Sequence, residues 1–453
     1  MVTLAVVILA AGQGTRMKSK RPKVLHPVAG EPMAKYVLDA ATPLQPQRLV
    51  LVVGNDASQV RHTLGEEILY VEQPQQLGTG HALLQARDAV GNEAETVLVL
   101  YGDTPLITPP ILRRLLGCHQ EVRATITMLT CCLKEPTGYG RVVRDEARRV
   151  LAVVEEAAAT TAQKGIQEVN SGMYCFDAAW LWPHLGQIGR NEKGEYYLTD
   201  LIAMAIAEGK RVEAVEVEDA TEVMGINHRA QLAEAEAAMR ARIRHEWMLA
   251  GVTLVDPPST WIDRGVRLHP DVTIHPNTFL QGRTVIGCDC VIGPNTIVRD
   301  SVIGERCRIL ASVVEGATLE DDVDVGPFSH FRPGAHLARG VHVGNFAEIK
   351  RSYVGEGSKV GHFSYLGDAT LGQKVNIGAG TVTCNYDGAQ KHPTVIEDGV
   401  FIGSDTMLVA PVRVGEGARI GAGSVVTRDV PPRSLAYGVP ARVIKEEGET
   451  NDG

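Results

Sequence analysis

The sequence lacks the features that mark several classes of protein. Aromatic residues make up only 5% of its 453 residues, and no apolar run reaches the roughly 18 residues that a membrane-spanning helix needs. The 45 basic residues are outnumbered by 54 acidic ones, and the resulting net charge of −9 argues against broad binding to nucleic acid or to an anionic membrane. A polyanion could still bind locally. We therefore predict a protein with neither a membrane nor a nucleic-acid partner.

A secreted protein held together by disulfides is also disfavoured. The apolar residues 4–11 follow no basic segment and are succeeded by Gly12-Gln13-Gly14, so they predict a buried first strand rather than a signal peptide. None of the eight cysteines forms a C-x-x-C pair, and a chain of this length does not depend on covalent staples. We expect reduced thiols and a cytoplasmic location. The length itself predicts two or three domains.

Residues 1–227 alternate short β-rich runs with helical stretches. The runs VTLAVVIL, RLVLVVG and TVLVLYGD are separated by stretches such as MAKYVLDAAT and GHALLQARDAV. This alternation predicts an α/β, Rossmann-like domain with a mostly parallel sheet covered on both faces. Ligands of such sheets bind at the C-terminal ends of the strands. Two of these ends carry polar residues, at 12–23 and at Gly102-Asp103.

Residues 228–250 have few helix-breaking residues, and Gly251 follows them as a stop signal. Their apolar residues recur at roughly helical spacing, at Leu232, Met239, Ile243 and Trp247. We predict a helix here that links the first domain to the second.

The second domain, residues 251–453, has the clearest periodicity in the chain. Aliphatic residues and one Phe recur every six positions, with slips of one residue between three sets: Ile262, Leu268, Ile274, Leu280, Ile286, Ile292 and Val298; Leu319, Val325, Phe331, Leu337, Val343 and Ile349; Ile396, Ile402, Leu408, Val414, Ile420 and Val426. This hexapeptide repeat predicts a left-handed parallel β-helix, a triangular prism of about nine or ten coils. A β-sandwich would instead need turn signals about every 8 to 12 residues. Residues 384–394, CNYDGAQKHPT, interrupt the period, and inserted loops of this kind are often functional.

The first glycine-rich turn is followed by five cations within eight residues. The segment LAAGQGTRMKSKRPKVL contains Arg16 and Lys23 together with Lys18, Lys20 and Arg21. Exposed backbone N–H groups beside such cations form a phosphate cradle. A dinucleotide site would need a third glycine where Met17 stands, and the Gly-Lys-Ser/Thr of a Walker A loop is absent. The alternative is a solvated basic loop.

These residues resemble the signature of the sugar-nucleotide pyrophosphorylases. The resemblance rests on L-A-A-G-x-G-T-R-M followed by R-P-K, on QLGTGHA at residues 76–82 and on Tyr101-Gly102-Asp103. Together with the hexapeptide repeat it covers nearly the whole chain. The sequence is most similar to bifunctional bacterial enzymes that acetylate glucosamine-1-phosphate with acetyl-CoA and then transfer UMP from UTP to N-acetylglucosamine-1-phosphate. The product, UDP-N-acetylglucosamine, would supply cell-envelope synthesis, including peptidoglycan and lipopolysaccharide.

The resemblance implies site residues in the first domain. Arg16 and Lys23 would offset the repulsion between the two anionic substrates, and Asp103 and Asn227 would hold Mg²⁺, which favours a few hard oxygen ligands. Taken alone, Asp103 could be a turn residue or a helix cap. The remaining nucleotide- and sugar-binding positions are Leu9, Ala10, Ala11, Gly12, Gln73, Gly78 and Thr79 for the nucleotide and Gly140, Glu155 and Asn170 for the N-acetylhexosamine. Gly78-Thr79-Gly80 could instead be the start of a helix.

One segment departs from the pattern of the family. After Glu155 the family has a basic and then an acidic residue before Ala-Thr, whereas this chain reads Glu156-Ala157-Ala158-Ala159-Thr160. The local contacts of this segment are therefore not predicted by the resemblance.

In the second domain, two cations stand where a bare prism does not need them. Arg332 and Lys350 each follow an inward-facing residue of the repeat and lie 18 residues apart, so they would stack on neighbouring coils about 4.8 Å apart. Like charges at that distance repel unless an anion bridges them, and a phosphate monoester would do so. The alternative is that Glu348 pairs with them.

The resemblance assigns His362 as the base that removes the amine proton during acetyl transfer, with Glu348 nearby to orient or polarise it. Arg332, Lys350, Tyr365 and Asn376 would hold glucosamine-1-phosphate. The acetyl-CoA groove would be lined by Ala379, Asn385, Tyr386, Ser404, Ala422 and Arg442. The small residues among these would suit a tight prism equally well. Arg442 lies in a C-terminal segment, SLAYGVPARVIKEE, that departs from the enterobacterial form of the enzyme.

Prisms of this family form homotrimers with sites between subunits, so we expect a homotrimer. Two other functions are compatible with the same architecture. The first is a single-activity pyrophosphorylase whose prism is structural or regulatory, and the second is an interaction protein without enzymatic activity, similar to exchange-factor subunits of translation initiation. Against the first stand Arg332, Lys350, His362 and the 384–394 loop. Against the second stand Arg16, Lys23, Asp103 and Asn227.

Overall fold

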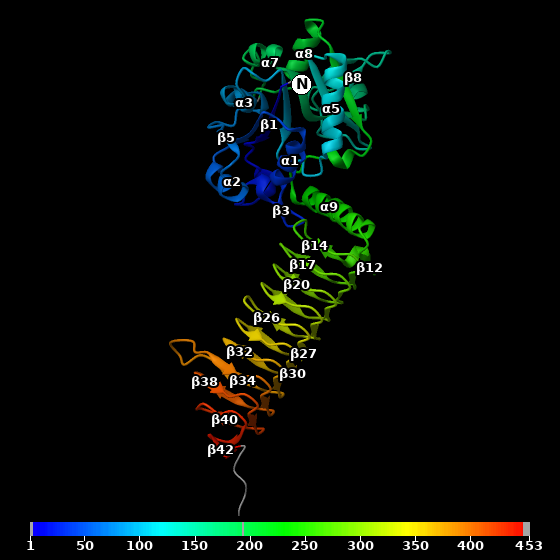
Figure 1. Ribbon diagram of the computed structural model, residues 1–453. Helices are drawn as coiled ribbons and strands as arrows, with labels where there is room; N and C mark the ends of the chain where they lie inside the picture. Colours follow the sequence, from blue (N-terminus) through cyan, green and yellow to red (C-terminus); the bar gives the residue numbers. More distant parts are fainter. Residues whose placement is uncertain (1–2, 193, 447–453) are drawn as a thin grey trace, which may run out of the picture. The chain divides into compact units, whose positions relative to one another are not determined.

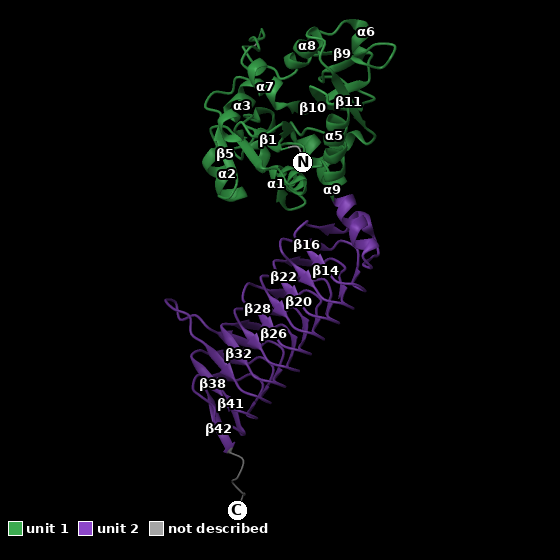
Figure 2. Cartoon of the chain, turned by 45° about the horizontal axis from the view of Figure 1, so that its top comes forward, with its two compact units in different colours: residues 1–239 green, residues 240–453 purple. Residues whose placement is uncertain are grey.

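The structure is a computed structural model that describes residues 3–192 and 194–446. Its residues cluster into two compact units, 1–239 and 240–453 (Figure 2). None of the described helices is both long and apolar enough to cross a membrane. All eight cysteines are free thiols.

Unit 1 is built around one sheet whose main strand order is β11-β7-β10-β6-β1-β4-β5, with β8 and β9 joined to it through β10 (Figure 1). Its strands are β1 (Leu4–Ala10), β4 (Arg48–Val53), β5 (Leu69–Glu72), β6 (Thr96–Tyr101), β7 (Ile126–Cys132), β8 (Arg141–Arg144), β9 (Val150–Val154), β10 (Glu168–Asp177) and β11 (Val212–Val217), and β2 (Pro27–Val28) and β3 (Glu31–Pro32) form a separate pair. Its helices are α1 (Met33–Ala41), α2 (Ala57–Leu64), α3 (Thr79–Gln85), α4 (Arg87–Val90), α5 (Pro109–Val122), α6 (Thr161–Lys164), α7 (Ala178–Leu185) and α8 (Asp200–Ala207). Short 3₁₀ turns are η1 (Thr15–Met17), η2 (Lys23–Leu25), η3 (Thr42–Leu44) and η4 (Ala220–Val223).

Strand β1 is the centre of this unit. All seven of its residues are buried, and alternate side chains enter two different cores, with Val6 and Ile8 on one face and Val7 and Leu9 on the other. A strand buried on both faces needs a continuous apolar run, as in the sequence LAVVILA. The prediction of a Rossmann-like sheet covered on both faces is confirmed.

The parallel register of β1 brings together the two strand ends that the sequence marks. Leu9 pairs with Tyr101 of β6 and Ala10 pairs with Val53 of β4. The segment 12–23 and Gly102-Asp103 therefore leave the sheet at the same edge. The sheet is not wholly parallel, because β10 runs antiparallel to both β6 and β7, with a register shift between Asn170 and Tyr174.

Helix α9 (Arg229–Leu249) contains the division between the two units. In its first half, Glu236 accepts a hydrogen bond from the backbone of Ala29 at 2.6 Å. In its second half, the guanidinium of Arg240 lies over the ring of Trp261 at 3.1 Å from the centroid. Each half is thus fixed within its own unit. The predicted boundaries at 227 and 250 lie close to the two ends of this helix.

Unit 2 is a left-handed parallel β-helix made of three sheets, which contain 12, 10 and 9 strands in the described part of the chain (Figure 1). The first sheet consists of β12 (Thr253–Leu254), β15 (Thr273–Ile274), β18 (Val291–Ile292), β21 (Arg308–Ile309), β24 (Asp324–Val325), β27 (His342–Asn345), β30 (Lys359–His362), β33 (Asn376–Ile377), β36 (Phe401–Ile402), β39 (Arg419–Ile420), β41 (Ser434–Gly438) and β42 (Ala441–Glu446). The second consists of β13 (Trp261–Ile262), β16 (Phe279–Gln281), β19 (Ile297–Arg299), β22 (Val313–Glu315), β25 (His330–Phe331), β28 (Glu348–Lys350), β31 (Tyr365–Gly367), β34 (Val382–Cys384), β37 (Met407–Val409) and β40 (Val425–Val426). The third consists of β14 (Arg267–Leu268), β17 (Val285–Ile286), β20 (Val302–Ile303), β23 (Thr318–Leu319), β26 (His336–Leu337), β29 (Tyr353–Val354), β32 (Ala369–Leu371), β35 (Thr394–Ile396) and β38 (Val412–Val414). A 3₁₀ turn, η5 (Pro257–Ser259), precedes β13.

The hexapeptide period corresponds to one strand and one corner of the prism. Every residue of the three predicted sets is buried, with at most 6% of its surface exposed. The interruption at 384–394 falls between β34 and β35, and this segment projects from the prism as the orange hairpin of Figure 1. The hairpin is closed by an antiparallel bridge between Tyr386 and Lys391. The prediction of a parallel β-helix is confirmed.

Candidate functional site

A cavity of about 580 Å³ in unit 1 opens at the edge where β1 and β6 end. The predicted residues that line it are Leu9, Ala10, Ala11, Gly12, Arg16, Lys23, Gln73, Gly78, Thr79, Asp103 and Asn227. The structure therefore brings together all the residues that the sequence analysis proposed for the nucleotide, its phosphates and the metal.

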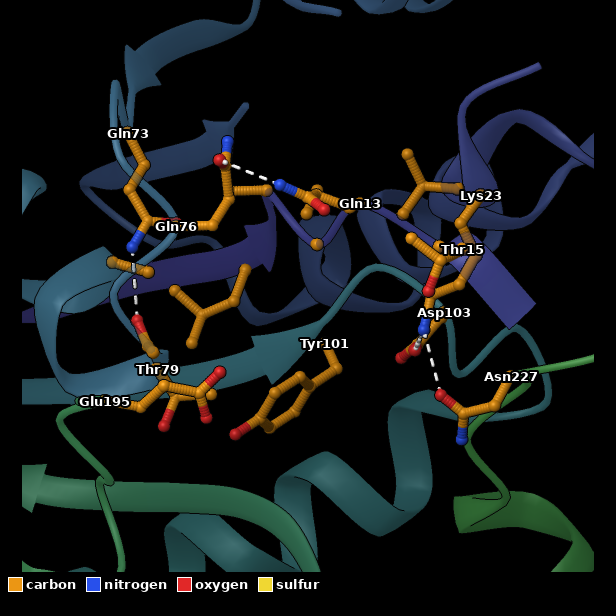
Figure 3. Close-up of a pocket in the computed structure, with 18 of the residues that line it drawn as sticks. Gln13, Thr15, Lys23, Gln73, Gln76, Thr79, Tyr101, Asp103, Glu195 and Asn227 are labelled. Carbon is orange, nitrogen blue, oxygen red and sulfur yellow. Dashed lines mark hydrogen bonds and ion pairs between the residues drawn. The ribbon is translucent and has the colours of Figure 1, made fainter. Parts of the chain in front are cut away.

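Four polar side chains converge at one end of this cavity, and Figure 3 labels three of them, Lys23, Asp103 and Asn227. The ammonium of Lys23 forms an ion pair with Asp103 and donates to Oδ1 of Asn227 at 3.1 Å. The Nη2 of Arg16 donates to the same Asn227 oxygen at 2.9 Å. The side chains of Lys23 and Asp103 are only 13% and 15% exposed. Two cations and two oxygen donors thus meet at one partly buried point, as a site for phosphate and a divalent cation requires.

The glycine-rich turn allows Lys23 to reach this point. Gly14 has φ +60°, and a Cβ there would lie 2.7 Å from Cβ of Lys23. Any larger residue would displace the lysine stem, so the second glycine of G-x-G has a steric role.

The opposite end of the cavity is formed by Gln73 and the turn before α3. Gln73 is 3% exposed, and its Nε2 donates to the carbonyl of Gly78 at 3.1 Å. Gly78 has φ +97°, and a Cβ there would lie 2.6 Å from the carbonyl oxygen of Tyr196. Oγ1 of Thr79 accepts a hydrogen bond from the backbone of Leu198 at 3.1 Å. Gly78 and Thr79 do begin a helix, α3, and they also hold the segment around Tyr196 against the cavity.

A second cavity of about 320 Å³ adjoins the first and shares part of its wall. The shared residues are Thr79, Tyr101, Asp103, Tyr197 and Asn227, and the predicted sugar-site residues Gly140, Glu155 and Asn170 line the second cavity. Asp103 and Asn227 therefore lie at the boundary between two compartments. Two ligands bound side by side would meet there.

The walls of the second cavity are fixed by hydrogen bonds. Asn170 donates from Nδ2 to the hydroxyl of Tyr174 at 2.6 Å, and its backbone N–H donates to the carbonyl of Gly140 at 2.9 Å. Oε1 of Glu155 accepts from the hydroxyl of Thr199 at 3.4 Å. Burial, reinforced by Asp103, raises the pKa of Tyr101, so its phenol is a neutral hydrogen-bonding group in this wall.

The segment that departs from the family has its own local structure. Thr160 caps α6 together with Gln163 in a reciprocal capping box. Glu156 accepts a hydrogen bond from Nη2 of Arg141 at 2.6 Å, and this contact lowers the pKa of Glu156.

The sequence analysis did not single out several residues of the first cavity, namely Gln13, Thr15, Gln76, Glu195 and Tyr197. Gln13 and Gln76 lie 3.5 Å apart between the side-chain Nε2 and Oε1. Glu195 and Tyr197 come from a loop far along the chain, and no local pattern marked them.

In unit 2, the predicted base and part of the predicted acetyl-CoA groove form one row along a corner of the prism. His362 pairs in register with Asn345 of the preceding coil. Two residues before His362, Val360 pairs with Ile377, which pairs with Ile402, which in turn pairs with Ile420, each on the next coil. Ala379, Ser404 and Ala422 stand two residues after the last three of these, as His362 stands after Val360. The backbone of Asp405 donates to Ala379 and that of Gly423 donates to Ser404. The row is lined by small residues.

The ring of His362 is exposed, and its Nδ1 lies 2.6 Å from Oδ1 of Asn345. Glu348 instead accepts a hydrogen bond from Nη1 of Arg332 at 2.9 Å. The expected role of Glu348 stays a prediction, and among the described residues the side-chain partner of His362 is Asn345 instead. The reason is geometric, because Asn345 is the register partner of His362, whereas Glu348 is the register partner of Tyr365.

The alternative that Glu348 pairs with the stacked cations holds for Arg332 only. Lys350 has another cation as neighbour, since the ammonium of Lys391 lies beside it and lowers the pKa of Lys350, with a further contribution from Arg332. Lys391 comes from the projecting hairpin and was not predicted. Arg332 and Lys391 thus both lie close to Lys350, and this concentration of positive charge suits a phosphate.

The remaining predicted residues lie around this cluster or farther along the prism. Gly367 pairs with Lys350, and a Cβ on Gly367 would lie 2.4 Å from the hydroxyl of Tyr365 and 2.7 Å from Nδ2 of Asn385. The side chains of Tyr365 and Asn385 therefore both lie over Gly367. Asn376 lies on β33 of the first sheet.

Tyr386, 59% exposed, lies in the hairpin. Arg442 lies on β42, where its Nη1 donates to the carbonyl of Ala441, and within the described part of the chain it has no hydrogen bond to Ala379, Ser404 or Ala422.

Comparison with known proteins supports the fold of both units. Residues 6–169 match the family model of the MobA-like NTP transferase domain, and residues 393–428 match that of the bacterial transferase hexapeptide with six repeats. The chain is 52% identical over 441 residues to the Bifunctional protein GlmU of Heliobacterium modesticaldum, covering 97% of this chain and 96% of that protein. It is 49% identical over 450 residues to the protein of the same name from Pelobacter propionicus, covering 98% of each, and 48% identical over 442 residues to that of Carboxydothermus hydrogenoformans, covering 97% and 99%.

Proposed function

Because the chain belongs to the GlmU family of bifunctional enzymes, we propose that its uridylyltransferase reaction takes place between the two cavities of unit 1 and its acetyltransferase reaction on the prism of unit 2. The protein is a nucleotidyltransferase and an acetyltransferase that uses UTP and acetyl-CoA. The assignment of each residue to a role is the proposal. The single observation that carries it for unit 1 is the position of Asp103 and Asn227 at the boundary of the two cavities.

We place UTP in the first cavity and N-acetylglucosamine-1-phosphate in the second. Uracil lies by Gln73, Gly78 and Thr79, with Leu9, Ala10, Ala11 and Gly12 along the nucleotide. Gly140, Glu155 and Asn170 hold the sugar. A phosphate oxygen of the sugar phosphate attacks the α-phosphorus of UTP, the bond from that phosphorus to the bridging oxygen breaks, and pyrophosphate leaves with the electron pair. Lys23 and Arg16 stabilise the charge that accumulates on the phosphates.

The residues at the cavity boundary fit a Mg²⁺ ion. No group of three or more His, Cys, Asp or Glu suited to a metal occurs within residues 3–192 and 194–446. Mg²⁺ does not require one, because it binds to one or two protein oxygens and takes its other ligands from water and phosphate. Asp103 and Asn227 both reach the ammonium of Lys23, so one cation can contact both oxygens. When bound there, Mg²⁺ would neutralise phosphate charge.

On the prism, Arg332, Lys350, Tyr365 and Asn376 bind glucosamine-1-phosphate, and Lys391 joins them at the phosphate. The amine nitrogen attacks the thioester carbon of acetyl-CoA, the carbon–sulfur bond breaks, and CoA leaves. Nε2 of His362 takes the proton from the attacking nitrogen. Ala379, Ser404 and Ala422 line the acetyl-CoA groove, with Asn385 and Tyr386 from the hairpin and Arg442 from the last strand. Four of these positions, His362, Ala379, Ser404 and Ala422, occur in the same row, which supports the proposal.

We further propose that the prisms form a homotrimer. Phe328, Phe346 and Phe363 stack on successive coils with centroids 5.4 and 5.1 Å apart, although they are 61%, 49% and 67% exposed. An exposed apolar ladder of this kind suits burial against a second copy of the chain. His362 directly precedes Phe363, so the proposed base lies beside this surface. A Phe346→Glu variant should become monomeric by light scattering and lose acetyl transfer while keeping uridylyl transfer.

The proposal assigns residues 1–227 to the uridylyltransferase, 228–250 to a linking helix and 251–453 to the acetyltransferase. It places the enzyme in the cytoplasm, where UTP and acetyl-CoA are made, and its product UDP-N-acetylglucosamine serves cell-wall synthesis.

Two assays test the division of labour. Thiol release from acetyl-CoA, with no UTP present, should depend on glucosamine-1-phosphate. Pyrophosphate release from UTP should depend on N-acetylglucosamine-1-phosphate. If the first reaction failed in a preparation that carried out the second, the prism would be a scaffold.

A further inference from the structure

A buried arginine lies beneath the second cavity of unit 1. Arg141 is 1% exposed, and it is the first residue of β8. Its Nη2 donates to Oε2 of Glu156 at 2.6 Å and its Nη1 donates to the carbonyl of Tyr139. Its Nε is buried and has no hydrogen-bond partner within the described residues. Glu156 is the only carboxylate in an ion pair with this buried charge in the described structure. A buried guanidinium depends strongly on such a partner.

Arg141 occupies the point where three strands meet. It pairs in register with Val154 of β9 and with Val169 of β10. The next residue after Val154 is Glu155 and the next after Val169 is Asn170, while Gly140 precedes Arg141. Each of the three proposed sugar-binding residues is therefore the chain neighbour either of Arg141 or of a residue that pairs in register with Arg141.

Glu156 connects two of these strand ends. It follows Glu155 directly, and besides the guanidinium of Arg141 its Oε2 accepts the backbone N–H of Gly138 at 3.4 Å. Gly138 and Gly140 both line the second cavity. A Cβ on Gly140 would lie 3.4 Å from Oε1 of Glu155, so the turn before β8 is close against the Glu155 carboxyl. Any movement of the turn relative to β9 would change the shape of this wall.

We propose that the Arg141–Glu156 ion pair is a positioning device that holds Gly140, Glu155 and Asn170 in place and thereby sets the affinity for the sugar-1-phosphate. Neither side chain lines either cavity, so the pair acts through its neighbours rather than by touching the substrate. This inference rests on the proposed placement of the sugar in the second cavity. It also gives a role to Glu156, which lies in the segment where the sequence departs from its family.

A second arginine–glutamate pair in the same sheet provides a matched control. Arg144 of β8 donates to Glu168 of β10 at 2.8 and 2.6 Å, and the two side chains are only 18% and 12% exposed. This pair also joins strands of the sheet, but neither of its residues lines the second cavity. Loss of either pair weakens the sheet, whereas only loss of the first is expected to disturb the sugar site.

The test is steady-state pyrophosphate release by full-length variants, with each substrate varied at saturating concentration of the other. Glu156→Gln should raise the KM for N-acetylglucosamine-1-phosphate about tenfold and leave the KM for UTP within about twofold, because uniform binding of one substrate is lost. Glu156→Asp, which keeps the charge, should restore part of the affinity. Glu168→Gln should lower the melting temperature without changing either KM. Equal sugar KM values for Glu156→Gln and Glu168→Gln, or parallel rises in both KM values, would overturn the inference.

Two further variants separate this inference from the proposed function. Arg141→Lys keeps a buried cation but loses the fork that reaches both Tyr139 and Glu156, so it should reproduce the rise in sugar KM if Glu156→Gln does not fold. Glu155→Gln tests the placement of the sugar directly. If Glu155→Gln leaves the sugar KM unchanged, the placement is wrong. If it raises that KM while neither Glu156→Gln nor Arg141→Lys does, only the positioning role is wrong.

Discussion

Nδ1 of His362 lies 2.6 Å from Oδ1 of Asn345, which is its register partner on the preceding coil. An amide oxygen can only accept a hydrogen bond, so this contact keeps the proton of the neutral imidazole on Nδ1 and leaves the lone pair on Nε2. The ring is exposed, and Nε2 is therefore open to a substrate. The neighbouring coil thus fixes the tautomer that a general base needs.

Replacing the base should separate the two activities. His362→Ala is expected to lower acetyl transfer by about 10²- to 10⁴-fold, the usual contribution of general base catalysis, and to leave uridylyl transfer unchanged. Thiol release and pyrophosphate release measured on the same preparation check this. Loss of both activities would contradict the two-site assignment.

Asn345→Ala should have a smaller effect of the same kind, about tenfold on kcat of acetyl transfer, because the ring loses its orientation but not its basicity. Asn295→Ala is the control, since Asn295 also forms an asparagine contact between coils, with Asn277 at 3.2 Å. A kcat unchanged in Asn345→Ala would mean that the hydrogen bond does not orient the base.

Removing the carboxylate at the cavity boundary should give the opposite result. Asp103→Ala takes away the partner of Lys23 and one of the two oxygens proposed for Mg²⁺, so uridylyl transfer should fall by about 100-fold or more while acetyl transfer persists. The matched variant is Asp39→Ala, which breaks the Lys35–Asp39 ion pair on α1. Its uridylyl activity should stay close to that of the unchanged protein. A similar loss in both variants would assign Asp103 a purely structural role.

The lysine contributed by the hairpin should affect both affinity and pH dependence. Lys391→Met removes a cation from the proposed phosphate site, so the KM for glucosamine-1-phosphate should rise about tenfold, with the KM for acetyl-CoA unchanged. Lys391 lowers the pKa of Lys350, so its removal should raise that pKa. The loss of substrate affinity at alkaline pH, where Lys350 loses its charge, should then shift to higher pH.

The measurement is the KM for glucosamine-1-phosphate between about pH 7 and pH 10. Lys374→Met, which removes an exposed lysine from the same prism, should leave the profile unchanged. If the KM of Lys391→Met for glucosamine-1-phosphate rose at the same alkaline pH as that of the unchanged protein, Lys350 would not be the group whose titration causes the rise.

Much of the fold could be predicted because its signals are local. The continuous apolar run of β1 indicates that this strand is buried on both faces. The six-residue period recurs over many coils of the prism, so a slip of one residue does not hide it. The cavity residues Arg16 and Lys23 lie in the segment that follows β1, and Asp103 lies just after β6. The parallel register of β1 with β6 accounts for their meeting.

The contacts that could not be predicted join residues far apart in the chain. Lys391 reaches Lys350 only because an 11-residue interruption returns to the prism as a hairpin. The resemblance implied that Glu348 lies near His362, but strand register makes Asn345 the side-chain partner of His362. Glu156 and Arg141 meet because β8 and β9 are antiparallel, and no repeat or motif encodes that pairing.

Gly78 should be essential to the nucleotide end of the first cavity for a steric reason. Its φ of +97° disfavours any other residue, and a Cβ would lie 2.6 Å from the carbonyl oxygen and 2.8 Å from the nitrogen of Tyr196. The backbone N–H of Tyr196 donates to Leu77 and its carbonyl accepts from Gly80, both at 2.8 Å, so the overlapping backbone cannot move without breaking these bonds. We therefore expect Gly78→Ala to raise the KM for UTP at least tenfold, equivalent to about 1.4 kcal/mol.

Gly91→Ala is the control that separates the effect of atomic overlap from that of backbone strain, because Gly91 has φ +72° but nothing within 4 Å of its added Cβ. That variant should lose about 1 kcal/mol of stability in denaturant unfolding and keep its KM for UTP. Equal effects of the two variants on this KM would mean that backbone strain alone, and not the contact with Tyr196, shapes the site.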